Sequence, residues 1–190
     1  LLTRDQEISL ARKIELTRMV FRRKVLESDY SAVTAIDILR QVSEGTLPFD
    51  RTMKMSTAEN LVRSVVKSRL PENMKTANKL LANNIKLFAE FLDGQDEASK
   101  KKAMKQIRRN RLKVATLLEE LSLRTSRIQP MMKKLEGILS KMHQVQKYIA
   151  AGPNADYIVE DIEAMKQEFN GLQDMALETP EQLEKRLRAV

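Results

Sequence analysis

The chain has 190 residues, of which 32% are charged, and its formal net charge is +8. The absence of Cys excludes disulfides and thiolate metal sites, and the sequence shows no signal peptide and no apolar run long enough to span a bilayer. Five Gly and five Pro leave few turns, so an all-α protein is predicted, and the positive charge favours a polyanionic partner such as nucleic acid or an acidic protein surface. A chain without Cys suits the reducing cytoplasm, which is the location we expect.

Two helices are predicted in the first quarter of the chain. The first covers residues 4–27 and begins at Thr3, which can cap the first turn while Gln6 returns the bond. The apolar residues of this helix are Ile8, Leu10, Ala11, Ile14, Met19, Phe21 and Val25. The stretch "SDYS" breaks the pattern, and a shorter helix over residues 32–42 is expected to bury Val33, Ile36 and Leu39. Residues 44–56, which contain a Gly and a Pro, are predicted to form a loop.

A proline divides the next predicted helical region. A helix capped by Ser56 or Thr57 is expected to end at Pro71, because proline disfavours helical geometry at the residue before it. A separate helix then covers residues 72–92 and ends at the turn "DGQD".

The second half of the chain carries three apolar stripes whose members are three and four residues apart. The stripes are Met104, Ile107, Arg111, Val114, Leu118 and Leu121; Ile128, Met131, Leu135, Ile138, Met142, Val145 and Ile149; and Ile158, Ile162, Met165, Phe169, Leu172 and Ala176. Sustained repeats of this kind predict long helices packed almost lengthwise, as in a coiled coil. Gly152 and Pro153 turn the second helix back on the third. The predicted fold is therefore an elongated helical bundle with a long antiparallel coiled-coil-like hairpin.

Two residues on the stripes need an explanation. Pro130 is compatible with its helix if that helix begins near Ser126 or Arg127, which places the proline in the first turn. Arg111 must either extend past the apolar stripe to solvent or pair with an acid.

A last helix is predicted over residues 180–190, after a threonine cap.

The sequence does not indicate catalytic chemistry. His143 is the single histidine and lies beside the second stripe, where a surface or boundary position explains it. There is no second His, no Cys and no glycine-rich phosphate loop, and the carboxylates are scattered over polar helix faces. We therefore expect no enzymatic activity, cofactor or metal.

The stretch "KKKAMKQIRRNRLK" is the densest concentration of charge. It contains Lys100, Lys101, Lys102, Lys105, Arg108, Arg109, Arg111 and Lys113, with no acid among them. One interpretation is a solvated helix face supported by acids on neighbouring helices. The other is a surface that binds nucleic-acid phosphates through counterion release, without sequence specificity. No aromatic residue interleaves with these cations, so base stacking is not indicated.

The first fifteen residues, "LLTRDQEISLARKIE", resemble the end of conserved sub-region 1.2 of primary-type bacterial sigma factors. The matching positions are Leu1, Leu2, Thr3, Arg4, Glu7, Leu10, Ala11, Ile14 and Glu15. Residues 117–135 are similar to the helical hairpin of the variable insert that follows in that family, and residues 178–190 to the approach to region two.

The resemblance implies a division of the chain into four parts. Residues 1–27 would be the end of sub-region 1.2, residues 28–95 the short-helix part of the insert, residues 96–177 its long three-helix hairpin, and residues 178–190 the start of the helix leading to region two. The chain would then be a piece of a factor that binds the RNA polymerase core subunits and promoter DNA, with no membrane partner and no small-molecule substrate.

Leu1, Leu2 and Arg4 would lie nearest the DNA-reading loop of that family, although a helix cap and core contacts also explain them. The alternative is a structural coiled coil or docking module unrelated to transcription. Packing of residues 1–15 onto the following helices would favour the sigma interpretation, whereas pairing of this segment with a second copy would favour the alternative.

Overall fold

The computed structural model of the chain describes residues 2–54, 59–153 and 157–190. Within these ranges the protein consists of eight helices without a β-strand, which confirms the predicted all-α class. The helices are α1 (Arg4–Leu26), α2 (Asp29–Ser43), α3 (Phe49–Thr52), α4 (Glu59–Asp93), α5 (Glu97–Glu119), α6 (Thr125–Ala151), α7 (Val159–Ala176) and α8 (Pro180–Arg188).

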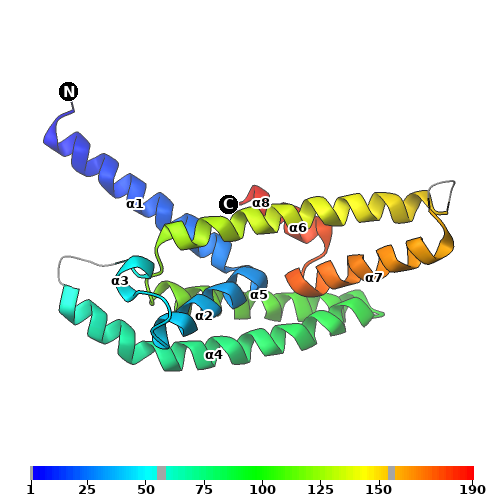
Figure 1. Cartoon of the computed structure of the whole chain (residues 1–190), viewed down its shortest axis with the longest axis horizontal. Helices are drawn as coiled ribbons and strands as arrows, with labels where there is room; N and C mark the ends of the chain where they lie inside the picture. Colours follow the sequence, from blue (N-terminus) through cyan, green and yellow to red (C-terminus); the bar gives the residue numbers. More distant parts are fainter. Residues whose placement is uncertain (1, 55–58, 154–156) are drawn as a thin grey trace.

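Two long antiparallel pairs dominate the molecule and give it an elongated shape (Figure 1). In the first pair α4 packs against α5, and in the second α6 packs against α7. Helix α2 contacts α4, α5 and α6, so it joins the two pairs, and α8 packs on α6. The predicted boundary at residue 95 thus separates two helices, α4 and α5, that lie side by side.

The apolar stripes of α5 and α6 are confirmed as buried faces, whereas only Ile162 and Ala176 of the third stripe are buried and Ile158 is exposed. In α6 the side chains from Ile128 to Val145 on the stripe are buried, and α7 packs against this face through Phe169 and Leu172. Gly152 ends α6 with φ of +70°, a conformation that a side chain disfavours, and the chain then reverses into α7. The long antiparallel hairpin therefore forms as predicted.

The largest core cluster lies where α1, α2, α4, α5 and α6 meet. Its fully buried large side chains are Leu26, Leu39, Met53, Leu118, Leu121, Leu123 and Ile128. A second cluster joins α6 to α7 and α8, and a third brings together Phe88, Ile107 and Leu177.

The predicted break at Pro71 is wrong, because α4 continues through it. An interior proline removes one helix hydrogen bond and costs about 3 kcal/mol. Leu70 and Leu81, on either side of Pro71, are both buried in the main core, and each such burial contributes about 2 kcal/mol. Core packing thus offsets the cost, and Figure 1 shows the first part of α4 running at an angle to the rest. The predicted caps Ser56 and Thr57 lie outside the described residues.

Three further predictions differ from the structure. Helix α2 begins at Asp29, three residues earlier than predicted, and Val33 is exposed on it. Residues 49–52 of the predicted loop form α3, and the following Met53 is buried against the main core. Pro130 lies in the second turn of α6, because the helix begins at Thr125.

The first half of α1 projects from the body of the molecule (Figure 1). Thr3 and Gln6 form the predicted reciprocal cap. Every residue from 2 to 14 is exposed, including the apolar residues Ile8, Leu10, Ala11 and Ile14. Only Arg22, Val25 and Leu26 of this helix are buried. The packing onto the following helices that would have favoured the sigma interpretation is therefore not seen for residues 2–14, although Glu15 pairs with Lys54.

Candidate nucleic-acid interface

The structure does not bring the two predicted sets of DNA-contacting residues together. Leu2 and Arg4 lie exposed at the free end of α1, and Leu1 lies outside the described residues. The basic run begins at the N-terminal end of α5, at the opposite end of the molecule in Figure 1. The two sets therefore form separate surfaces.

Helix α5 presents the basic run to solvent. Asp96 caps the helix by accepting a hydrogen bond from the backbone N–H of Ser99 at 2.7 Å, and the hydrogen bonds from Ser99 lower the pKa of the Asp96 carboxyl. The exposed cations that follow are Lys101, Lys102, Lys105, Arg108, Arg109 and Lys113, while Lys100 is half-buried. Among the described residues, none of these seven has an ion pair with an acid. The acids on neighbouring helices therefore support only Arg111 in this run.

Helical spacing divides the exposed cations between two edges of α5. Lys101, Lys105 and Arg108 follow one another at steps of four and three, which places them on one side of the helix. The second edge carries Lys102, Arg109 and Lys113. We call these the inner edge and the outer edge, because Lys105 and Arg108 face α8 across a cavity and the outer edge does not line that cavity.

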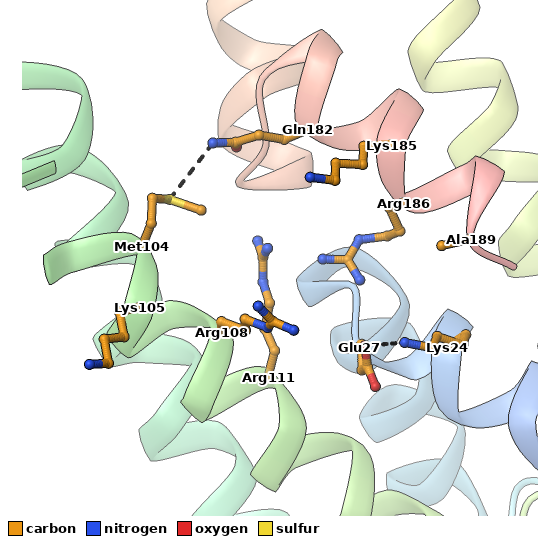
Figure 2. Close-up of a pocket in the computed structure, with 10 residues that line it drawn as sticks. All are labelled: Lys24, Glu27, Met104, Lys105, Arg108, Arg111, Gln182, Lys185, Arg186 and Ala189. Atoms are coloured by element: carbon orange, nitrogen blue, oxygen red, sulfur yellow. Dashed lines mark hydrogen bonds and ion pairs between the residues drawn. The ribbon is translucent and has the colours of Figure 1, made fainter. Parts of the chain in front are cut away.

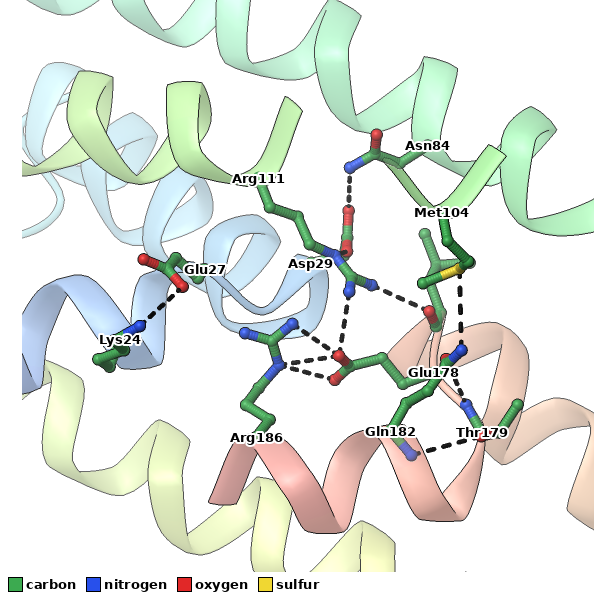
Figure 3. Close-up of polar contacts among 11 residues, drawn as sticks. Lys24, Glu27, Asp29, Asn84, Met104, Arg111, Glu178, Thr179, Gln182 and Arg186 are labelled. Atoms are coloured by element: carbon green, nitrogen blue, oxygen red, sulfur yellow. Dashed lines mark hydrogen bonds and ion pairs between the residues drawn. The ribbon is translucent and has the colours of Figure 1, made fainter. Parts of the chain in front are cut away.

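Arg111 meets two acids in the interior. Its guanidinium pairs with Asp29, the first residue of α2, and donates to Glu178 Oε1 at 3.0 Å (Figure 3). It also donates to the carbonyl oxygen of Leu177 at 2.9 Å. Arg111, Asp29 and Glu178 are 6%, 3% and 2% exposed, so the structure resolves the predicted alternative for Arg111 in favour of a buried acid.

Leu177 has a backbone conformation suited to this contact. It follows α7 in the left-handed region, with φ of 50°. A non-glycine residue seldom adopts this conformation, and here its side chain is buried beside Phe88 and Ile107. The packing of the side chain thus holds a strained residue whose carbonyl group accepts from Arg111.

A chain of amides extends the network to α4. Asn84 donates to Asp29 at 2.6 Å, and Asn110 donates to Asn84 at 2.8 Å. Both amide side chains are fully buried, and Gln106 donates to Asn110 at 2.9 Å. The network therefore links α2, α4, α5 and the turn before α8.

Arg186 fastens α8 to the same network. Its guanidinium donates to both carboxylate oxygens of Glu178 at 2.6–2.9 Å. Burial alone would lower the pKa of Arg186, but the hydrogen bonds and charge of Glu178 outweigh that effect and raise it. Two carboxylates thus balance two guanidinium groups, which is the condition under which charges are tolerated in an interior.

Only one member of this network, Arg111, could be identified as unusual from the sequence. Arg111 stood out because it occupied a position on an apolar stripe. Asp29, Glu178 and Arg186 gave no such signal, since each occurs among other polar residues near a helix end. His143 is exposed beside the α6 stripe, as predicted.

In the described part of the chain, no three His, Asp or Glu side chains gather closely enough to hold a metal ion. Among the same residues, no helix combines the length and the apolar character needed to cross a membrane. Comparison of the sequence with models of protein families and with curated proteins finds no match.

Proposed function

We propose that this chain is a module of a primary-type bacterial sigma factor that acts in the cytoplasm by binding the core RNA polymerase and DNA, without catalysis. The proposal rests on the resemblance of residues 1–15 to sub-region 1.2, because the packing of this segment onto the following helices, which would have favoured it, is not seen in the projecting half of α1. The residues that resemble sub-region 1.2 lie on this half, and all of those within residues 2–14 are exposed. Ile8, Leu10 and Ile14 leave apolar surface without a partner among the described residues, as expected for a protein contact.

The polymerase contact is tested by measuring association of the chain with purified bacterial core RNA polymerase. We expect binding by the unaltered protein and loss of binding in the double variant Leu10→Lys/Ile14→Lys. Both positions are exposed, so the substitutions should leave the fold intact. Ile85→Lys is the matched control, because Ile85 is an apolar residue on α4 that is at least as exposed as Leu10 and Ile14. Absence of binding by the unaltered chain would remove the proposal.

The same exposed segment also supports the docking or coiled-coil alternative. Apolar residues on a solitary helix favour pairing with a second copy of that helix. Sedimentation equilibrium separates the two functions. A dimer that becomes a monomer in Leu10→Lys/Ile14→Lys, together with no polymerase association, would establish the alternative.

The DNA contact is assigned to the basic face of α5. Its cations lack acidic partners among the described residues, so they are available to phosphates. Binding of a short duplex should weaken steeply with salt, with a logarithmic slope of about −0.9 for each phosphate neutralised. Replacing the outer edge by Lys102→Gln/Arg109→Gln/Lys113→Gln should flatten the slope by about 2 to 3. Binding that hardly changes between low and moderate salt would contradict this assignment.

A further inference from the structure

A cavity of about 480 Å³ lies between the end of α1, the inner edge of α5 and one face of α8 (Figure 2). Its volume falls in the range of small-molecule sites, which is roughly 300–1,000 Å³. Figure 2 shows Lys185 and Arg186 of α8 across the cavity from Lys105 and Arg108 of α5. Three segments that are distant in the sequence thus converge on one space.

The cavity is strongly positive. Its walls carry six cationic side chains: Lys24, Lys105, Arg108, Arg111, Lys185 and Arg186. Three carboxylates oppose them, because Glu27 pairs with Lys24 while Asp29 and Glu178 neutralise the two network arginines. Six positive charges against three negative ones leave an excess of three.

The excess charge is carried by Lys105, Arg108 and Lys185. None of the three has an ion pair among the described residues. Arg108 and Lys185 lie on two opposing walls, whereas Figure 2 shows the ammonium of Lys105 pointing away from α8. The walls themselves are fixed, since Arg186 and Arg111 are held by hydrogen bonds to Glu178.

We propose that this cavity binds a small ligand that carries two or more adjacent phosphate groups, a class that includes pyrophosphate and nucleoside polyphosphates. A ligand with about three negative charges matches the excess on the walls, and guanidinium groups recognise phosphate oxygens in pairs. Met104 and Ala189 supply apolar lining that a single phosphate would not need. A duplex presents its phosphates on a convex surface, whereas this space is walled by three helices. The ligand is therefore compact.

The proposal is tested by isothermal titration calorimetry, which measures the affinity of the whole chain for pyrophosphate and triphosphate as sodium salts. Sodium sulfate serves as the reference anion. Arg108→Gln and Lys185→Gln are each expected to weaken pyrophosphate binding roughly tenfold to a hundredfold, as loss of a charged hydrogen bond predicts. Both residues are exposed, and a thermal melt of each variant confirms that the fold is kept. Arg109→Gln is the matched control, because it removes the same charge from the outer edge of the same helix and should leave binding unchanged.

Three results would overturn the proposal. The first is no binding of pyrophosphate or triphosphate, and the second is binding no tighter than that of sulfate. The third is an equal loss of affinity in Arg109→Gln, which would indicate attraction by net charge alone.

A parallel titration with a short DNA duplex identifies the phosphate source. If Arg108→Gln and Lys185→Gln weaken DNA binding while pyrophosphate does not bind, the cavity serves the nucleic-acid backbone and the small-ligand proposal fails.

Discussion

Replacement of Arg111 by methionine should destabilise the protein more than any other single charge removal on α5. Methionine retains most of the aliphatic volume, so the loss is electrostatic and not a cavity. Arg111→Met removes the contacts to Asp29, Glu178 and Leu177. Glu178 keeps the paired donors of Arg186, but Asp29 keeps only the amide of Asn84. The variant therefore leaves a carboxylate that is 3% exposed without an ion-pair partner, although the charge of Arg186 still acts on it.

Breaking a buried pair from one side costs about 3–5 kcal/mol. That is a large part of a typical stability of about 5–15 kcal/mol. Urea unfolding at pH 7, followed by far-ultraviolet circular dichroism, measures the change. Arg109→Met is the matched control on the exposed face of the same helix, and its free energy of unfolding should change by less than about 0.5 kcal/mol.

A double variant tests whether the unpaired charge of Asp29 causes the loss of stability in Arg111→Met. Asp29→Asn together with Arg111→Met removes the stranded charge, so the pair should be less destabilising than the sum of the single changes. The reasoning is refuted if Arg111→Met is as harmless as Arg109→Met, or if the effects of the two network substitutions simply add.

Three other substitutions test the fold. Ile138→Asp places a charge in the α6–α7 interface and should lower the free energy of unfolding by about 3 kcal/mol or more. Glu136→Gln, on the exposed side of α6, should leave the melting temperature unchanged, and an unchanged melting temperature in Ile138→Asp would contradict the predicted stripe. Thr179→Ala removes the cap of α8 and should lower the free energy of unfolding by about 1 kcal/mol in a urea titration, while Thr179→Ser should retain it. The hydrogen bond from Lys54 lowers the pKa of Glu15, so this contact stabilises the folded state above the ordinary carboxyl pKa and is lost as the pH falls through the lower, folded value. Lys54→Met should raise the Glu15 pKa in a carbon-13 NMR titration, and an unshifted curve would argue against the contact.

Periodicity predicted the helices of the second half well, because their burial depends on neighbours along the same hairpin. The stripes of α6 and α7 are continuous, and the glycine at residue 152 marks the reversal. The continuation of α4 through Pro71 and the exposure of the first half of α1 could not be read from periodicity, for a common reason. Whether a proline is tolerated, or an apolar face is covered, depends on helices from other parts of the chain.

Of the candidate sites, those built from neighbouring residues could be predicted from the sequence, and those built from distant segments could not. The basic run of α5 is visible as a local cluster of cations. The partners of Arg111 are not, because Asp29 lies 82 residues away and Glu178 lies 67 residues away. The cavity depends on the docking of α8, where the two cations that line it, Lys185 and Arg186, have no local feature that links them to α5.

The projecting half of α1 has a consequence for how any partner would recognise it. Isolated helices of about a dozen residues are marginal in water, and within the described part of the chain residues 4–14 are exposed, without tertiary packing to sustain them. Their backbone amides should exchange with deuterium far faster than those of α5. A partner that covers this segment must also supply the free energy that orders it, so affinity would be modest for the area buried, and small changes in helix propensity there would tune it.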